Sequence, residues 1–181
     1  MTLDAVRHGA TGRRGTIRAP MDDRDTSALP AFSDAEQRRF MTLALEESQH
    51  ALPACLPNPP VGCVIVRDGV VVAHGFTGAP GTPHAEAAAL LALGTGLDTE
   101  TLTLFVTLEP CAFVGRTPSC AQAIVASGIR SVFVGTLDPD ARNDGAGIDI
   151  MRRAGITVQV GVLEVRVRDF ITPYLVTRPG A

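Results

Sequence analysis

The chain has 181 residues, of which 45% are hydrophobic and 19% are charged, and its formal net charge is −3. This length suits one domain that buries a sizeable core, and the mild acidity provides no field that would attract nucleic acid or an anionic membrane. No apolar run approaches the ~20 residues of a membrane span, and no apolar stretch follows the N-terminal arginines, so we expect neither a membrane anchor nor a secretory signal. The arginines leave an organelle transit peptide open, although serine is scarce there.

The four cysteines are too few for a disulfide scaffold in a chain of this size: Cys55, Cys63, Cys111 and Cys120. Cys63 lies in the apolar run VGCVIV, where we expect a small buried hydrophobic residue. Cys55 has no evident chemical role. The composition favours a reducing, cytoplasmic setting, in which the remaining pair is more typical of a metal site or of catalysis than of a disulfide.

The chain divides into an N-terminal arm and one domain. Residues 1–31 lack hydrophobic periodicity and contain Gly, Arg, Pro and Asp clusters, so we expect an irregular arm outside the core. Residues 32–181 are expected to form the domain. Its first helix covers residues 33–48, because an apolar stripe at helical spacing follows Ser33 and Glu36, which fit a capping box.

Strands and helices alternate after that first helix. Two apolar runs are joined through Asp68-Gly69, the usual two-residue turn of a β-hairpin. For one later helix we expect Thr117 as the N-cap and Pro118 as the first helical residue. The last segment fits a helix or an edge strand, and we favour a helix. The expected elements are strands 61–66 and 69–76, helix 83–94, strand 101–108, helix 117–128, strand 129–137, helix 147–155, strand 156–162 and helix 163–176. This order predicts an α/β fold whose partly parallel sheet is covered on both faces.

Side chains that bind metals gather at two strand-to-helix junctions, where α/β proteins place their sites. His84 opens one helix, and Cys111 and Cys120 flank the other junction. One imidazole and two thiolates make three zinc ligands and leave the fourth tetrahedral position for water, as in catalytic zinc sites. Zinc makes that water acidic enough to react near neutral pH. With Thr117 as the N-cap, Cys120 would be the third helical residue, where the helix dipole favours a thiolate, and His84 would lie in the first turn of its own helix.

Glu86 follows His84 by two residues, so in a helix it points in a different direction. We expect it beside the metal, where it would take a proton from the activated water and pass it to a leaving amine. The order H-x-E followed by P-C-x(n)-C is the signature of zinc-dependent base deaminases. These features predict one catalytic Zn²⁺ per chain in a zinc-dependent hydrolytic deaminase.

Four segments together closely resemble the deaminase domain of bacterial riboflavin biosynthesis, which belongs to the cytidine-deaminase-like superfamily: HAE, TLEPC, PNPPVGCVIV and GRTPSC. The likeness runs from about residue 37 to about residue 175. It includes the eight residues between the two cysteines, where most nucleoside and tRNA deaminases have two. The resemblance implies a three-layer α/β/α sandwich around a five-stranded mixed sheet. It also implies a homo-oligomer, either a dimer or a tetramer.

The resemblance also implies roles for individual residues. The zinc ligands would be His84, Cys111 and Cys120, and the proton-transfer residue would be Glu86. Asn58 would hydrogen-bond the heterocycle, and Arg116 would lie at the substrate mouth. Phe113 stands where the family has a substrate-contacting histidine. A carboxylate at Asp140 would repel a substrate phosphate unless Arg142 or Arg116 offsets it. We expect no reductase domain of the kind that often follows the deaminase, which leaves a separate reductase partner open.

Simpler interpretations stay open for the substrate contacts. Asn58 also fits a turn residue between prolines, and Arg116 fits an exposed loop charge. Phe113 fits a hydrophobic plug over the site as well as a ring that stacks on an aromatic substrate. His74 is expected on a strand, facing solvent or a partner rather than a metal.

The leading hypothesis is deamination of a small aminated heterocycle, such as an aminopyrimidine ribosyl phosphate like that of riboflavin biosynthesis. A deaminase of another base or nucleoside in a specialised pathway is an alternative. An enzyme that edits tRNA or other nucleic acid is disfavoured by the net charge and by the long segment between the cysteines. An inactive zinc-binding subunit is the alternative of a different class. Glu86 and a set of three rather than four ligands argue against it.

Overall fold

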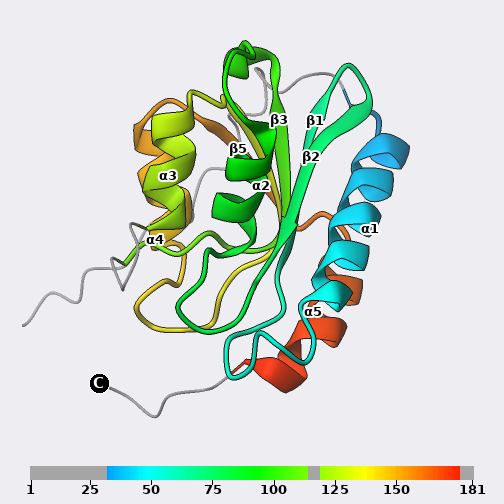
Figure 1. Ribbon diagram of the computed structural model, residues 1–181, viewed down its shortest axis with the longest axis vertical. Coiled ribbons are helices and arrows are strands. Elements are labelled where there is room, and N and C mark those ends of the chain that lie inside the picture. The colour runs from blue at the N-terminus through cyan, green and yellow to red at the C-terminus, as the bar shows by residue number, and fades with distance from the viewer. Residues whose placement is uncertain (1–31, 114–118, 176–181) are drawn as a thin grey trace, which may run out of the picture.

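The computed structural model describes residues 32–113 and 119–175 (Figure 1). The expected order of helices and strands is confirmed, with two short 3-10 helices in addition. The expected arm, residues 1–31, lies outside the described residues. The elements are α1 (Asp34–His50), β1 (Gly62–Arg67), β2 (Val70–Phe76), α2 (Ala85–Leu93), η1 (Thr99–Thr101), β3 (Thr103–Leu108), α3 (Cys120–Ser127), β4 (Ser131–Thr136), α4 (Ala146–Arg153), β5 (Thr157–Val160), α5 (Glu164–Ile171) and η2 (Thr172–Tyr174).

The five strands form one mixed sheet in the order β2-β1-β3-β4-β5. β1 pairs antiparallel with both β2 and β3, whereas β3, β4 and β5 pair in parallel. The hairpin between β1 and β2 turns at Asp68 and Gly69, whose φ angles of 51° and 76° are those that a two-residue hairpin turn requires. β2, β3 and β4 therefore all end at the edge of the sheet where β1 begins.

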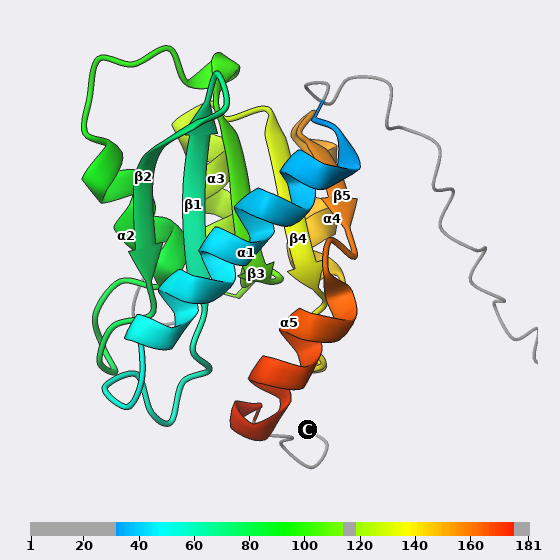
Figure 2. The same ribbon diagram turned by 90° about the vertical axis from the view of Figure 1, so that its right-hand side faces the viewer.

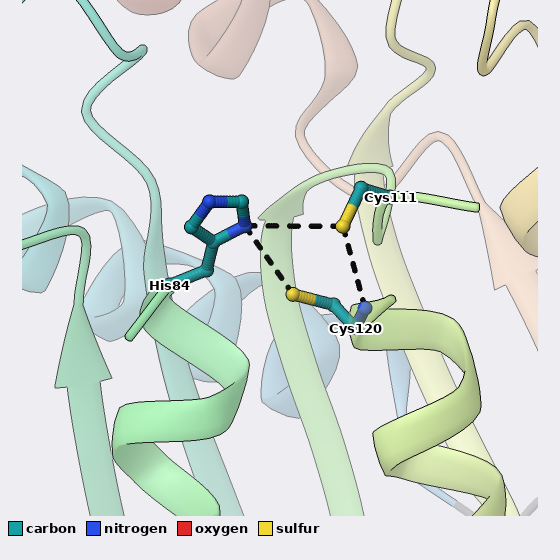
Figure 3. Close-up of side chains that lie close together, drawn as sticks. All are labelled: His84, Cys111 and Cys120. Carbon is teal, nitrogen blue, oxygen red and sulfur yellow. Dashed lines mark hydrogen bonds between the residues drawn. The ribbon is translucent and has the colours of Figure 1, made fainter. Parts of the chain in front are cut away.

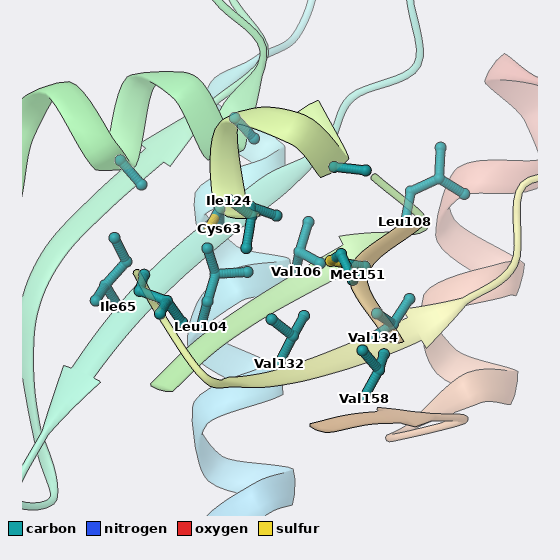
Figure 4. Packing of buried hydrophobic residues seen from close by; sticks show 14 of the residues in the cluster. Cys63, Ile65, Leu104, Val106, Leu108, Ile124, Val132, Val134, Met151 and Val158 are labelled. Carbon is teal, nitrogen blue, oxygen red and sulfur yellow. The ribbon is translucent and has the colours of Figure 1, made fainter. Parts of the chain in front are cut away.

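Helices cover both faces of this sheet, so the predicted three-layer α/β/α sandwich is confirmed. α1 and α5 lie on one face (Figure 2), and α2, α3 and α4 lie on the other. Under α1 the core is aromatic: Phe40, Phe105 and Phe133 are fully buried, and the rings of Phe105 and Phe133 stack with centroids 4.6 Å apart. Under α3 and α4 the core is mostly aliphatic, as Figure 4 shows for Val106, Ile124 and neighbouring residues.

The start of α1 is formed as the sequence predicts. The backbone N–H of Ser33 donates a hydrogen bond to Glu36 Oε2 at 2.9 Å, and the backbone N–H of Glu36 donates to Ser33 Oγ at 3.3 Å. These two bonds are the capping box. The preference for a helix in the last segment is also confirmed, because α5 ends at Ile171 and continues as η2.

Two helix starts differ from the prediction. α3 begins at Cys120 with Ser119 as its N-cap, so the expected N-cap Thr117 is wrong, and Cys120 is the first helical residue rather than the third. Ser119 takes the cap because its Oγ accepts a hydrogen bond from the backbone N–H of Gln122 at 3.2 Å. α2 begins at Ala85, so His84 is the N-cap residue and lies just outside the first turn.

Of the helices within residues 32–113 and 119–175, none combines the length and the apolar character needed to cross a bilayer.

Candidate active site

The strand directions bring the metal-ligand residues to one edge of the sheet. The segment after β2 leads to His84, and Cys111 follows the end of β3 by three residues. α3, which begins at Cys120, packs beside α2 on the same face of the sheet. The two junctions singled out in the sequence therefore meet in space.

His84, Cys111 and Cys120 form a compact cluster (Figure 3). Nδ1 of His84 lies 3.8 Å from Sγ of Cys111 and 3.4 Å from Sγ of Cys120. The three ligand atoms all lie within 4.8 Å of one another. In the part of the chain that the structure describes, no other group of three or more His, Cys, Asp or Glu residues is gathered as closely.

The dimensions of this cluster fit zinc. Bonds of about 2.1 Å to nitrogen and about 2.3 Å to sulfur in a tetrahedron imply N···S separations of about 3.6 Å and an S···S separation of about 3.8 Å. The two N···S distances, 3.4 and 3.8 Å, lie on either side of that value. Among the described residues the cluster has three ligands and no fourth, which is the arrangement that leaves a position open for chemistry.

The contact between the two thiols shifts their pKa values in opposite directions. The hydrogen bond from the Cys120 thiol lowers the pKa of Cys111 to about 4, and His84 acts in the same direction. The same bond raises the pKa of Cys120, and burial raises it further. The backbone N–H of Cys120 also donates to Cys111 Sγ at 3.3 Å, which favours the thiolate form of Cys111. Both sulfurs would bind a metal as thiolates, so metal binding would release protons from this pair.

Glu86 lies in the first turn of α2 and is 3% exposed. Burial raises the pKa of Glu86 to about 7, and the negative charge of Cys111 acts in the same direction. A carboxyl group with a pKa near neutrality can both accept and donate a proton at physiological pH. The side chain also interacts with Cys120, so it is placed beside the cluster rather than in it.

Two residues outside the cluster support it, and the sequence reasoning gave neither a role. Glu109 is 3% exposed and Asn143 is 1% exposed. Asn143 Oδ1 accepts a hydrogen bond from the backbone N–H of Ala112 at 2.8 Å, immediately after Cys111. Glu109 accepts backbone hydrogen bonds from the loop and helix that follow β4. The only available signal was their position, since Glu109 directly follows a buried strand and Asn143 lies in the loop after the next one.

Phe113 is half-buried two residues after Cys111, and it belongs to neither hydrophobic core among the described residues. The guanidinium carbon Cζ of Arg142 lies over its ring, 4.3 Å from the centroid. Arg142 also donates to Asp140, from Nε to Oδ1 at 2.9 Å and from Nη2 to Oδ2. The repulsion expected from Asp140 is thus offset by Arg142, one of the two arginines considered for that role.

The remaining sequence candidates lie as follows. Asn58 is half-buried in the turn before β1, at the sheet edge that carries the cluster, and its backbone N–H donates to Cys55 O at 2.9 Å. His74 is confirmed as a solvent-facing strand residue, with its side chain 61% exposed and its Nδ1 3.0 Å from Glu47 Oε2. Cys63 is fully buried, as expected. Arg116 lies outside the described residues.

Comparison with known families places the chain among the zinc deaminases. Residues 34–136 match the family described as the cytidine and deoxycytidylate deaminase zinc-binding region, and the chain belongs to this family. The fold agrees, because the dCMP deaminase of cyanophage S-TIM5 superposes with a TM-score of 0.55 at 23% identity, over 71% of this chain and 99% of that one.

Relatives with higher sequence identity to this chain are proteins named for riboflavin biosynthesis. The riboflavin biosynthesis protein RibD of Aquifex aeolicus is 44% identical over 147 residues, which cover 78% of this chain and 40% of the relative. The structure of RibD from Acinetobacter baumannii has a TM-score of 0.73 at 38% identity, over 79% of this chain and 40% of that one. A diaminohydroxyphosphoribosylaminopyrimidine deaminase/5-amino-6-(5-phosphoribosylamino)uracil reductase from Thermotoga maritima has a TM-score of 0.72 at 40% identity, over 78% and 40%. The chain thus spans well under half the length of these relatives.

Proposed function

We propose that this zinc deaminase removes the amino group of an aminopyrimidine ribosyl phosphate, the class of compound named for its Thermotoga maritima relative. In this proposal the zinc ligands are His84, Cys111 and Cys120, and Glu86 transfers protons. The observation that carries the proposal is the three-ligand cluster with a buried carboxyl group of pKa about 7 beside it. A closed four-ligand site or an exposed carboxylate would lack this chemistry.

A zinc ion held by the three ligands would supply Lewis-acid activation of a water molecule near neutral pH. Glu86 accepts a proton from the water as it adds to the amine-bearing carbon and passes it to the ring nitrogen. It then moves the hydroxyl proton of the adduct to the departing amine. The carbon–nitrogen bond breaks, ammonia leaves, and a carbonyl group remains. The low exposure of Glu86 keeps its pKa within the range in which both transfers are possible.

The substrate contacts belong to the same proposal. The side chain of Asn58, at the sheet edge where β1 begins, hydrogen-bonds the heterocycle. The ring of Phe113 provides a flat surface for stacking. A phosphate group on the ribose is compatible with this site because the carboxylate of Asp140 is already paired with Arg142.

Zinc content and ammonia release test the proposal together. Purified protein should hold about one zinc per chain and release ammonia from the diaminopyrimidine nucleotide. The variant Glu86→Gln should keep its zinc and lose deamination by a factor of about 10² to 10⁴, the usual contribution of a general acid–base group. Glu100→Gln, at an exposed glutamate remote from the cluster, is the matched control and should keep full activity. An active Glu86→Gln enzyme contradicts the mechanism. Release of ammonia only from nucleosides or from RNA contradicts the substrate class.

We also infer the wider organisation of the protein. The catalytic domain covers residues 32–181 and acts in the cytoplasm as a homo-oligomer, and a reductase acts on its product in the next step. Support comes from the relative whose name joins a deaminase to a reductase, in a chain that extends well beyond the part matched here. Sedimentation of the full chain and of residues 32–181 would test both the assembly and the dispensability of the arm.

A further inference from the structure

Arg142, Asp140 and Phe113 form a small unit on the loop beside the cluster. The guanidinium group of Arg142 makes three contacts with the Asp140 carboxylate, from Nε at 2.9 and 3.2 Å and from Nη2, and it covers one face of the Phe113 ring. The Asp140 side chain is 19% exposed and the Arg142 side chain is 45% exposed. The arginine is therefore held on one edge by a carboxylate and against one face by an aromatic ring.

The loop that carries this unit is itself tied to the metal-ligand segment. The side chain of Asn143, the next residue after Arg142, accepts from the backbone N–H of Ala112 at 2.8 Å. The backbone N–H of Asp140 donates to Asp138 Oδ1 at 3.0 Å, and that of Asn143 donates to Asp140 O at 2.7 Å. These hydrogen bonds hold the loop that carries Arg142 against the segment that carries Phe113. Phe113 is two residues after Cys111 in that segment.

Fold stability gives little reason for this arrangement. An ion pair and a cation–π contact that are only partly buried each contribute about 1 kcal/mol or less to folding. Phe113 packs into neither core among the described residues. The α-carbon of Phe113 also lies no more than about 7 Å from that of Cys111, because two residues span no more than that even when extended. The Phe113 ring thus belongs to the segment that follows Cys111 and has one face against Arg142.

We propose that Arg142, oriented by Asp140, is a positioning residue that holds the Phe113 ring as one wall of the heterocycle site. This inference rests on the proposed function, in which Phe113 stacks on the substrate. Fixing the ring before the substrate arrives removes an ordering cost from binding, so the arginine acts on affinity through the phenyl ring. Asp140 already neutralises the charge of Arg142. In this inference the Arg142–Asp140–Phe113 unit therefore contacts the flat ring of the substrate and not its phosphate.

The kinetic signature follows from this role. Stacking is made in the ground state as well as in the transition state, so its loss raises KM and leaves kcat almost unchanged. Phe113→Leu should raise KM by about 3- to 10-fold, which is the range of an aromatic pair. Arg142→Ala and Asp140→Ala should each raise KM by a similar or smaller factor. Zinc content should stay at the wild-type level in all three variants.

A double-mutant cycle separates positioning from direct binding. In the Phe113→Leu background, Arg142→Ala should have no further effect on KM, because the ring through which it acts is gone. Phe113→Tyr, which keeps an aromatic face, should restore the dependence on Arg142. Arg130→Ala is the matched control, since Arg130 also pairs with a carboxylate, at 3.4 Å, but lies at the opposite end of β4. If Arg142→Ala raises KM equally in both backgrounds, and only for substrates that carry a phosphate, the arginine binds the phosphate directly and the inference is wrong.

Binding without turnover distinguishes this inference from the proposed function. Calorimetry of the diaminopyrimidine nucleotide with zinc-loaded Glu86→Gln protein should show about 3- to 10-fold weaker binding when Phe113→Leu or Arg142→Ala is added. A wild-type protein that binds the nucleotide in this way but releases no ammonia contradicts the proposed function alone. Equal binding with and without the substitutions contradicts the positioning role alone.

Discussion

Glu109 Oε1 accepts a hydrogen bond from the backbone N–H of Gly147 at 2.9 Å, and this bond joins the end of β3 to the start of α4. Glu109 Oε2 accepts two more, from the backbone N–H groups of Gly145 at 3.1 Å and Asp138 at 3.3 Å. A carboxylate at a helix N-terminus is favourable because the free N–H groups carry partial positive charge. The backbone that leads to Cys111 is therefore fixed by a residue outside the metal cluster.

Removal of this carboxylate should loosen the fold at the site. In Glu109→Gln the amide group can accept fewer of the three hydrogen bonds, so the free energy of unfolding should fall by about 1–3 kcal/mol. Urea unfolding followed by circular dichroism measures the change. The exposed Glu100 provides the matched substitution, and Glu100→Gln should change stability by no more than about 0.5 kcal/mol. Equal stability of the two variants would show that the buried bonds of Glu109 contribute nothing net.

The close approach of α4 to the same segment gives a second prediction. A Cβ atom on Gly147 would lie 1.9 Å from Pro110 O, so Gly147→Ala must push apart α4 and the residue before Cys111. We expect a loss of about 1–3 kcal/mol in stability, as in other overpacked cores, together with weaker zinc binding. Thermal unfolding and competition with a zinc chelator measure the two effects. Retention of wild-type zinc affinity in a destabilised variant would mean that the metal site does not depend on this contact.

The ligand assignment predicts which cysteines matter for metal content. His84→Ala, Cys111→Ala and Cys120→Ala should each reduce bound zinc well below one per chain, as measured by elemental analysis. Cys55→Ala changes another buried cysteine outside the cluster and should keep the metal. A chelator should lower the unfolding temperature of the wild type but not of the ligand variants, because a metal that binds only the native state stabilises it. If the Cys111→Ala variant retained its zinc, Cys111 would not be a zinc ligand.

The capping box at the start of α1 predicts a pH dependence of stability. The Ser33 hydroxyl donates to Glu36 Oε2 at 2.7 Å, and this hydrogen bond lowers the pKa of Glu36 below its usual 4.5. A carboxyl group with a lowered pKa in the folded state stabilises the fold above its unfolded pKa. That stabilisation is lost as the pH falls through the folded value. Ser33→Ala should therefore lower the urea midpoint at pH 7, and the difference from wild type should shrink at pH 3. If the urea midpoints of Ser33→Ala and wild type differed equally at pH 7 and pH 3, the ionised Glu36 carboxylate would not contribute to the effect of the capping box.

Features that depend on neighbouring residues were predictable from the sequence. Asp68-Gly69 set the hairpin, and Ser33 with Glu36 set the start of α1, since in each case the interacting groups lie within a few positions of each other. The gathering of His84, Cys111 and Cys120 was predictable for a different reason: H-x-E followed by P-C-x(n)-C is the signature of zinc-dependent base deaminases.

Features that depend on distant partners were not predictable. Glu109 has its partners 29 to 38 residues away, in backbone N–H groups that sequence patterns do not reveal. Asn143 bonds a backbone N–H 31 residues away for the same reason. The choice between Thr117 and Ser119 as N-cap depended on which hydroxyl reaches a free N–H, and both residue types are suitable. The contact of Arg142 with Phe113 requires the loop after β4 to lie over the segment after β3, which only the assembled sheet shows.

The spacing of the ligands along the chain has a consequence for biogenesis. His84 is 27 residues from Cys111 and 36 residues from Cys120, and the three stand on separate junctions. A nascent chain cannot present them together until β1 and β3 have paired and α3 has docked, because closing such loops costs entropy that only the finished sheet offsets. We therefore expect metal uptake to accompany or follow the assembly of the sheet. Bound zinc in a purified sample would then report a folded subunit.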